Sequence, residues 1–422
     1  MRRVAHVARV LCRVAWFVAA TRAEGQSPSG ARFGVMGTAV VTRADPAYLG
    51  ATYTEGYFTQ PNVMAEYRRG PMQFAGTVNL EGYTLRKGEL NAGMYGEGYV
   101  DRRHPHTLVH EAMVSAVTPS VRGARLSLAA GKGFTPFGTD DPMIRPFEKY
   151  PVNHHHAQVI ERVVAIGAIA LGDARRSAVL EQSVFNGDEP YASFAAPRWS
   201  RFGDSHATRF TARALDGVEW QISRAFVRSP GIVQGGAFDH RQLSTSLRVD
   251  KSTAHGARRY VLAEYARTDE SLERVHAFRF ESVLAEAMME WRGASVAVRA
   301  EQTDRPENER LLDPFRTQAG HIDFQIIGVT RWRVASVAVT AVPVSLPRIR
   351  ARFVPFLEIS LAHPEARRLP TVFEPRQFYG GTMLSSLSAG VRVHAGRMRA
   401  RMGRYGVLAD ALSPTMSHEM QH

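Results

Sequence analysis

The chain has 422 residues, of which 44% are hydrophobic, with a single cysteine and a formal net charge of +13. It contains no run of about 18 apolar residues, because Glu161 and Arg162 interrupt the best candidate at 159–171, and this excludes helical membrane spans. The lone cysteine, Cys12, lies so close to the N-terminus that disulfides and cysteine catalysis are excluded for an exported mature chain.

Residues 1–23 predict an export signal. A basic start contains Arg2, Arg3, Arg9 and Arg13, and the apolar stretch 14–20 leads into Thr-Arg-Ala, which is similar to a small-residue cleavage site. An unstructured basic N-terminus is the alternative. Without the five arginines of this segment the net charge is +8, and export together with the lack of a basic helix argues against nucleic-acid binding.

Segments with alternating apolar and polar residues recur along the mature chain. They lie at 72–83, 218–227, 242–249, 296–301, 322–326, 349–360 and 387–394. In the first of them Met72, Phe74 and Val78 share one face, whereas Gln73 and Thr77 share the other. Because successive side chains of a strand point to opposite faces, each segment predicts a strand with one apolar and one polar side.

Short and long connections alternate between these segments. Tight turns are predicted at Gly70-Pro71, Asp173-Ala174, Asp216-Gly217, Arg292-Gly293 and Gly396-Arg397, and longer connections at 44–60, 84–107, 133–155, 187–206, 228–238, 304–320 and 363–383. This rhythm predicts an all-β fold: a transmembrane antiparallel β-barrel of roughly 16–18 strands with short periplasmic turns and long outer loops. A soluble β-sandwich is the alternative, although it rarely has so many long strands.

No linker divides the mature chain, so a single barrel domain is expected. The boundaries are a signal peptide at 1–23, a short segment at 24–32, the barrel at 33–408 and a C-terminal tail at 409–422. Pro355 falls inside an alternating segment, and since a closed barrel has no free edge, we expect a bulge there. Alternation of Met398, Ala400 and Met402 predicts a last strand that runs up to Tyr405.

The octapeptide at 131–138, Gly-Lys-Gly-Phe-Thr-Pro-Phe-Gly, resembles an element of the phosphate-selective porins. In that family a strand runs into a Gly-Lys/Arg-x-Phe-x-x-Pro-Phe-Gly element and then into a long loop. The resemblance implies a porin-like barrel, but the family's lysine-rich ladder has no counterpart in a chain with four lysines. Phe134 and Phe137 are expected to anchor the loop root at the membrane interface or against the inner wall.

Charged residues on the polar faces are expected to line the lumen, and an excess of arginine there would favour anions. The alternative is that arginines and acids pair with one another within the wall. The expected pore-lining residues are Arg125, Arg209, Arg213, Arg299, Arg331, Arg350, Arg352, Arg392, Arg399, Arg401, Glu81, Glu301 and Glu358.

Histidines gather in two of the predicted loops. The candidate metal ligands are His104, His106, His110, Asp140, His154, His155 and His156. Imidazole and carboxylate groups suit zinc, copper or nickel, although the spacing matches no established template. The alternative is a polar loop that is hydrogen-bonded to its neighbours.

The motifs give no support for catalysis. No nucleophile elbow or HExxH element occurs, and Lys132 stands in a Gly-Lys-Gly that lacks the rest of a phosphate-binding loop, so we expect no enzyme and no cofactor. The sequence predicts a porin-like channel of a Gram-negative outer membrane for diffusion of small anionic solutes. The alternative is an outer-membrane metal-binding or adhesion barrel that acts through its histidine-rich loops. The expected partners are outer-membrane lipid, lipopolysaccharide and small anionic solutes, without nucleic acid, for a monomer or a trimer.

Overall fold

A computed structural model of the chain describes 30–47, 49–84, 106–139, 145–152, 157–159, 161–173, 176–190, 192–232, 234–252, 257–308, 326–347, 351–368, 374–396 and 401–410. The predicted export signal at 1–23 lies outside these residues and stays a prediction. Within the described ranges, no helix is both long and apolar enough to cross a membrane.

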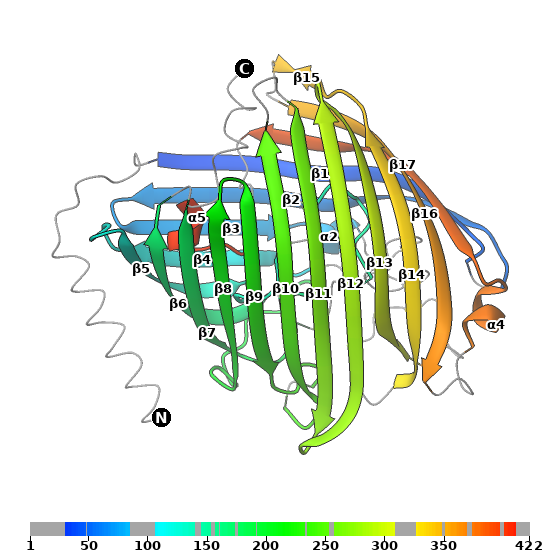
Figure 1. Cartoon of the computed structure of the whole chain (residues 1–422), viewed down its shortest axis with the longest axis horizontal. Helices are drawn as coiled ribbons and strands as arrows, with labels where there is room; N and C mark the ends of the chain where they lie inside the picture. Colours follow the sequence, from blue (N-terminus) through cyan, green and yellow to red (C-terminus); the bar gives the residue numbers. More distant parts are fainter. Residues whose placement is uncertain are drawn as a thin grey trace.

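Strands make up 68% of the described structure, with almost no helix (Figure 1). They are β1 (Gly30–Asp45), β2 (Tyr53–Arg69), β3 (Met72–Asn79), β4 (Val109–Val117), β5 (Ala124–Gly133), β6 (Arg162–Gly172), β7 (Ser177–Phe185), β8 (Ser205–Leu215), β9 (Val218–Val227), β10 (Asp239–Ser252), β11 (Arg258–Leu272), β12 (Val275–Trp291), β13 (Ala294–Asn308), β14 (Ile326–Thr340), β15 (Val344–Leu346), β16 (Ala351–Arg368) and β17 (Leu384–Gly396). The short helices α2 (Glu81–Thr84), α4 (Pro375–Tyr379) and α5 (Val407–Asp410) complete the described elements.

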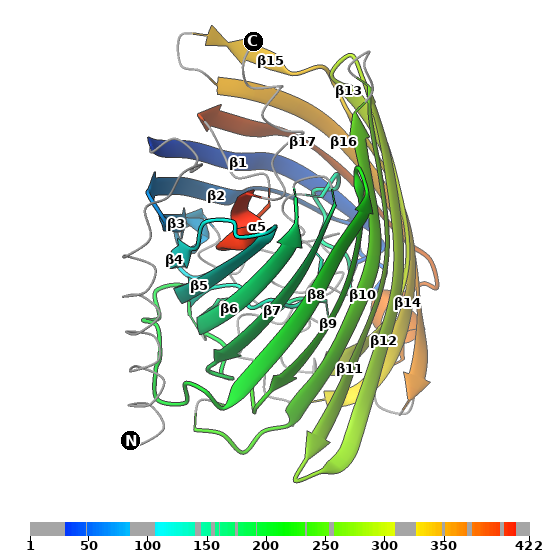
Figure 2. The ribbon, with the colours of Figure 1, turned by 60° about the vertical axis from the view of Figure 1, so that its left-hand side comes forward.

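The strands form one closed antiparallel wall. Each long strand pairs with the next one along the chain, β14 pairs with β16, and β17 returns to pair with β1 from Gly34↔Gly396 to Asp45↔Ser385. The three-residue β15 pairs only with β16, so the closed barrel has 16 strands (Figure 2). Closure gives each of the 16 strands of the barrel a partner on both sides, which a wall immersed in lipid requires. The predicted all-β barrel is confirmed.

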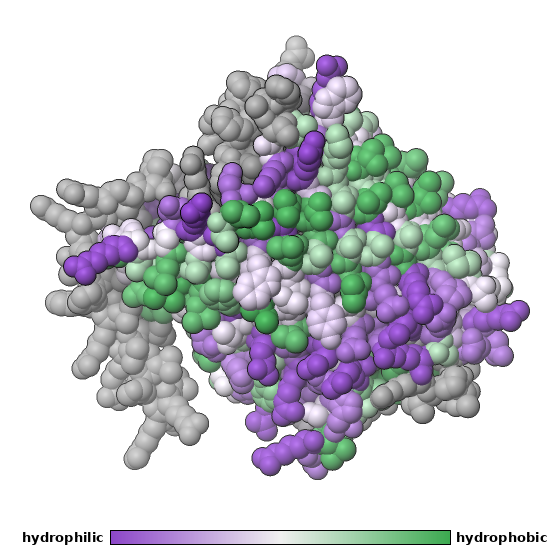
Figure 3. Space-filling view, in the orientation of Figure 1, coloured by the Kyte–Doolittle hydropathy of each residue, from purple (hydrophilic) through white to green (hydrophobic). Residues whose placement is uncertain are grey.

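Alternation along the strands separates an apolar outside from a polar inside. In β9, Trp220 and Ile222 are 43% and 36% exposed, whereas Glu219, Gln221 and Ser223 between them are almost completely buried. The same separation holds in the described parts of the other alternating segments. Apolar side chains form a broad green band on the outer wall in Figure 3, as lipid contact requires.

One end of the outer wall is polar instead. Purple side chains gather at the lower right of Figure 3, where strands such as β11 and β12 run toward the end that carries the longer connections. Asp269 on β11 pairs there with Arg267 at 3.0 Å and with Arg279 on β12 at 2.6 Å. Because ion pairs of this kind favour water over hydrocarbon, these strand ends extend beyond the apolar band.

Short and long connections alternate along the chain as predicted, with one exception. Short turns join β2 to β3, β6 to β7, β8 to β9 and β12 to β13, as predicted, and the opposite ends of the strands carry the longer connections. At that end, however, β11 and β12 are joined by only Glu273 and Arg274, which both have positive φ (48° and 74°). Two successive positive φ values suit a tight hairpin turn. The sequence did not predict this turn, because neither residue is the glycine that usually marks one.

The bulge expected at Pro355 lies in the neighbouring chain segment: three residues, 341–343, between the pairs Thr340↔Phe356 and Val344↔Phe353 stand opposite only Val354 and Pro355. β16 pairs with β17 in unbroken register through Pro355↔Val391. The Pro355 carbonyl accepts a hydrogen bond from Ala341 N at 2.9 Å, at the point where the other neighbour of β16 changes from β14 to β15. Because the N and C=O of one residue point to the same side in an antiparallel sheet, the missing N–H of Pro355 also faces Ala341, and the β16–β17 ladder loses no bond.

The expected last strand up to Tyr405 is wrong in its described part. β17 ends at Gly396, which has a φ of 75°, and residues 401–410 form no strand. The physical reason is closure: β17 already pairs with β1 along most of its length, so no free edge remains. Residues 401–410 instead lie inside the barrel, where α5 is visible behind β5 and β6 in Figure 2.

Candidate functional site

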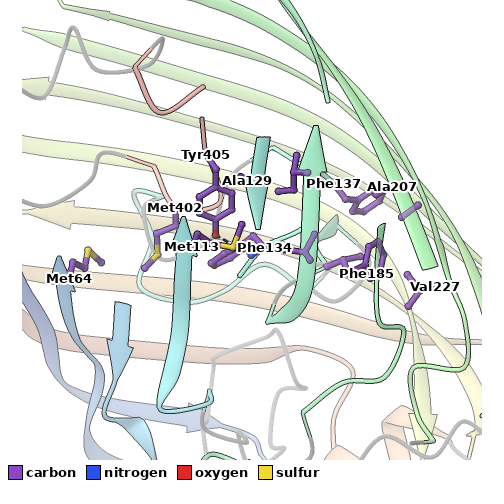
Figure 4. Close-up of a cluster of buried hydrophobic side chains, with 14 of the residues drawn as sticks. Met64, Met113, Ala129, Phe134, Phe137, Phe185, Ala207, Val227, Met402 and Tyr405 are labelled. Atoms are coloured by element: carbon purple, nitrogen blue, oxygen red, sulfur yellow. Dashed lines mark hydrogen bonds between the residues drawn. The ribbon is translucent and has the colours of Figure 1, made fainter. Parts of the chain in front are cut away.

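The segment that follows β5 turns into the barrel. Phe134 and Phe137 are buried in a cluster with Met113, Phe185 and Tyr405 (Figure 4). Gly138 N donates a hydrogen bond to Ser223 Oγ of β9 at 3.0 Å, so the start of the segment lies on the inner wall. Two anchoring positions were expected for the phenylalanines, the membrane interface and the inner wall. The structure places both side chains on the inner wall.

Residues 145–152 of the same segment reach other parts of the wall. Arg145 pairs with Glu264 of β11 at 3.1 Å and with Glu286 of β12 at 3.4 Å. Val152 N donates to Glu301 Oε2 at 2.8 Å, and Glu148 N donates to Glu358 Oε2 at 2.9 Å. These contacts run from β9 round to β16, so the segment lies within the lumen and narrows it.

Lys149 of this segment is buried among wall side chains. Its Nζ donates to Ser360 Oγ at 3.3 Å and to Ser386 Oγ. Burial lowers the pKa of the Lys149 ammonium to about 8; the nearby Glu358 carboxylate opposes this shift and the Arg299 guanidinium adds to it. The inward segment therefore carries a cation whose charge is lost within a mildly alkaline range.

A second inward element comes from the C-terminal part of the chain. Tyr405 OH donates to Glu111 Oε1 at 2.7 Å and accepts a hydrogen bond from Phe134 N at 3.1 Å. Val407 N donates to Ser127 Oγ of β5 at 3.1 Å, and α5 places Val407 and Leu408 in a buried cluster with residues of β4, β6 and β7. Residues 401–410 thus fill the lumen beside the first inward segment.

Three arginines surround one carboxylate where this element meets the wall. Glu219 of β9 lies 2.8 Å from Arg401, 3.1 Å from Arg213 and 3.8 Å from Arg404. Arg404 also donates to the Thr139 carbonyl, which links the two inward segments. Among the groups that the structure describes here, three guanidinium groups therefore share one carboxylate.

Most of the residues expected to line the lumen do face it, but many of the arginines are paired with acids. Arg209 pairs with Glu181 at 2.6 Å and Arg299 with Glu286 at 2.7 Å, while Arg392 pairs with Glu148 of the inward segment at 2.9 Å. Strand alternation also places Arg125, Arg213, Arg352, Glu301 and Glu358 on the inner face, and Arg401 reaches the lumen from the C-terminal element. Arg350 and Arg399 lie outside the described residues.

Arg331 faces outward, contrary to the expectation. It stands between Thr330 and Trp332 of β14, both of which are buried on the inner face. Arg331 pairs with Asp304 of β13 at 2.7 Å, and Arg367 reaches the same carboxylate. Near the loop end of β14 the outward-facing positions therefore carry charged side chains. Their ion pairs lie in the polar part of the outer wall.

Glu81 lies in α2 rather than on a strand. Asn79 Oδ1 accepts a hydrogen bond from Glu81 N at 2.8 Å, and this side-chain contact ends β3 and begins the helical turn. The Glu81 carboxylate is fully buried and accepts hydrogen bonds from Thr59 Oγ1 at 3.0 Å and Gln60 N at 2.9 Å. Its role in the described structure is to hold the connection between strands, and it is not a pore-lining group.

Two of the candidate metal ligands come together with an acid that was not among them. His110 Nδ1 lies 2.6 Å and His106 Nδ1 3.4 Å from Glu161 Oε1, which also accepts a hydrogen bond from Thr107 N at 3.0 Å. Burial alone would raise the pKa of the Glu161 carboxyl, but hydrogen bonds from both histidines hold it well below its usual range. His104, Asp140 and His154–156 lie outside the described residues.

The position of several residues of these clusters could not be predicted from the periodicity of the sequence. Arg145 and Arg404 lie on inward segments whose side chains follow neither strand nor helix spacing. Glu161 had one sequence cue, since it interrupts the otherwise apolar stretch 159–171 immediately before β6. Burial of an ionised carboxylate costs free energy unless the carboxylate is paired. An acid at the start of an apolar strand therefore indicates a partner nearby.

The closed wall, the apolar outside and the polar, segment-filled inside define a transmembrane β-barrel of the outer-membrane type, with a porin-like fold. This architecture belongs in the cell outer membrane.

Comparisons with known proteins add the following. No family model and no curated protein matches the chain. Among solved structures it is similar to the anion-selective porin from Comamonas acidovorans, with 6% identity and a TM-score of 0.47 over 88% of this chain and 100% of that one. OmpT, an outer membrane protein of Vibrio cholerae in its trimer form, has 8% identity and a TM-score of 0.44 over 87% and 100%. OccK8 (OprE) of Pseudomonas aeruginosa has 8% identity and a TM-score of 0.35 over 87% and 98%.

Proposed function

We propose that the protein is a porin-like channel through which small solutes diffuse across the outer membrane. The observation that carries this proposal is the closed, polar-lined barrel whose lumen is narrowed by residues 134–139, 145–152 and 401–410. A barrel of this strand number is wide enough for an aqueous lumen. Because the two inward segments occupy part of that lumen, the channel admits small solutes rather than bulky ones.

The cluster around Glu219 supports a preference for anions. Arg213, Arg401 and Arg404 surround this carboxylate, so arginines outnumber acids among the described groups of the cluster. Elsewhere in the described lumen the arginines are largely matched by acids, for example Arg299 by Glu286. Charged rings in a narrow pore select ions of opposite sign. The selectivity therefore depends on this cluster more than on the total number of arginines.

The outer wall suggests the remaining partners. Its apolar band fits lipid hydrocarbon, and the ionic groups near the loop ends, such as Arg279 and Asp269, fit the headgroup region that lipopolysaccharide forms in the outer leaflet. We include both as proposed contacts. Mass measurement of the detergent-solubilised protein distinguishes a monomer from a trimer.

The test is electrical. We expect the purified protein to produce discrete conductance steps in a planar bilayer, and a salt gradient to give a reversal potential of the sign set by anions. The double variant Arg401→Ala, Arg404→Ala releases the C-terminal element from Glu219 and leaves that carboxylate with one cation. It should conduct more and shift the reversal potential toward cations.

The matched control removes an arginine from outside the lumen. Arg279→Ala breaks the pair with Asp269 on the outer wall and should leave conductance and selectivity unchanged. Absence of any steps with folded protein would refute the channel. Unchanged selectivity in the double variant would remove the anion preference and leave the channel itself standing.

The second hypothesis, a barrel acting through its histidine-rich loops, has one specific observation in its favour. This is the meeting of His106, His110 and Glu161. Adhesion has no such support in the residues that the structure describes.

A further inference from the structure

His106, His110 and Glu161 form a compact set of ligand atoms. One nitrogen from each histidine and one carboxylate oxygen all lie within 4.8 Å of one another. His106 comes from the connection between β3 and β4, His110 is the second residue of β4, and the acid comes from the connection between β5 and β6. Only folding brings these two connections together, so the set exists in the native barrel and not in the local sequence.

The spacing is close to that of a tetrahedral metal centre. Ligand atoms about 2.1 Å from a tetrahedral ion lie about 3.4 Å from one another. His106 Nδ1 and Glu161 Oε1 are already 3.4 Å apart. His110 Nδ1 lies 2.6 Å from the same oxygen, a hydrogen-bond distance, so an ion that replaces the shared proton requires these two groups to separate by less than 1 Å.

The surroundings favour a cation at this place. Glu161 and His110 are almost completely buried and His106 nearly so, and a buried carboxylate is strongly stabilised by a positive charge. Lys132, the nearby ammonium group, donates to Thr107 Oγ1 and to the Val109 carbonyl, and its charge also interacts with the Glu161 carboxylate. Glu161 has a φ of 56°, a conformation rarely adopted outside glycine, and such strain is concentrated at functional sites.

We propose that His106, His110 and Glu161 bind a divalent transition-metal ion, for which Zn²⁺ is the best match. Two imidazoles and one carboxylate form a three-ligand zinc set that leaves one position for water or a solute group. The ion would fix both ends of the first inward segment. Phe134 at its start packs against the His110 ring at 5.2 Å between centroids, and Glu161 stands at its end.

The experiment is a calorimetric titration of Zn²⁺ into the folded, untagged barrel in detergent after removal of metal by a chelator. We expect one ion to bind per chain and the melting temperature to rise. Loss of an outer-shell partner alone commonly costs about 10–100-fold in affinity, so loss of a ligand in His106→Ala should weaken binding by at least about tenfold. Glu161→Gln keeps an acceptor for Thr107 N while removing the charge, and should weaken binding similarly.

Two controls make the outcome specific. His240→Ala removes a histidine that lies 3.3 Å from the buried Glu270 but is not part of the His106–His110–Glu161 set, and binding should stay as in the wild type. A variant with His104 and His154–156 all replaced by alanine should also keep the site. The proposal is overturned if the wild type binds no zinc, if His106→Ala binds it unchanged, or if the His104/His154–156 variant loses it. Because the readout is calorimetric, the result is independent of whether the barrel conducts.

Discussion

At the scale of single residues, Gly138 controls where the first inward segment goes. It has a φ of 74°, and a Cβ there would lie 1.9 Å from the carbonyl oxygen of Ala157. Gly138→Ala therefore combines backbone strain with a clash that no side-chain rotation relieves. We expect a lower melting temperature and an altered single-channel conductance, because the segment must move away from the wall.

Gly203 provides the matched control for this substitution. Its φ is 93°, but no atom lies within 4 Å of the position a Cβ would take. Gly203→Ala should show the cost of positive φ alone, on the order of 1 kcal/mol, with normal conductance. If both variants conduct like the wild type, Gly138 does not position the constriction.

We expect Lys149 to make the proposed anion selectivity depend on pH. Its pKa is lowered to about 8, chiefly by burial, so raising the pH from 7 to 9 removes one positive charge from the lumen. The ratio of anion to cation permeability should therefore fall through this range, with a midpoint near the same pH. Reversal potentials measured at fixed salt gradient and stepped pH give the curve.

Lysine replacement separates this charge from other titrating groups. Lys149→Met should be less anion-selective at pH 7 and flat up to pH 9, because it lacks the charge throughout. Lys251→Met, at the exposed end of β10, should titrate like the wild type. A wild-type curve without a step near pH 8 would contradict the prediction.

Some residues of the candidate site could be predicted from the sequence, and others could not. Glu301 and Glu358 could be placed on the inner face from sequence, because strand alternation fixes the face of every residue once one residue is assigned. Their partners, Val152 and Glu148, could not, because a connecting segment has no periodicity that predicts where it lies. Sequence therefore identified one half of each contact.

At the scale of elements, β16 and β17 show how a closed wall accommodates a proline inside a strand. Pro355 and Val391 are directly paired, yet their backbone groups point in opposite directions. The carbonyl of Pro355 faces Ala341, so the groups of Val391 face β1, where Val391 pairs with Ala39 at the closing seam. A sequence pattern does not reveal which side of a strand a backbone group faces.

Proline should therefore be tolerated at one member of this pair and not at the other. Val391→Pro removes a bond from the β1–β17 seam and should destabilise the barrel by about 3 kcal/mol or more. Pro355→Val should change the unfolding free energy by less than about 1 kcal/mol. Denaturant unfolding in detergent measures both, and equal losses would refute the assigned direction of the backbone groups.

At the scale of the whole molecule, two separate demands shape the same wall. The outside must suit hydrocarbon over a band of limited height, and the inside must provide partners for the polar groups of the two inward segments. Alternation meets both demands at once, because each strand contributes to both surfaces. This is why the fold class could be predicted from the sequence, whereas the contents of the lumen depend on long-range contacts between elements.

The limited height of the apolar band predicts how an added charge is tolerated along one strand. Val298 of β13 is 49% exposed on the outer wall, and Gln302 lies on the same face nearer the loop end, where it accepts a hydrogen bond from Arg333 at 3.1 Å. Val298→Arg places a charge in hydrocarbon and should cost about 2–4 kcal/mol, whereas Gln302→Arg should cost no more than about 1 kcal/mol. Unfolding in lipid vesicles and in detergent compares them. Similar costs at the two positions would mean that the apolar band does not end between them.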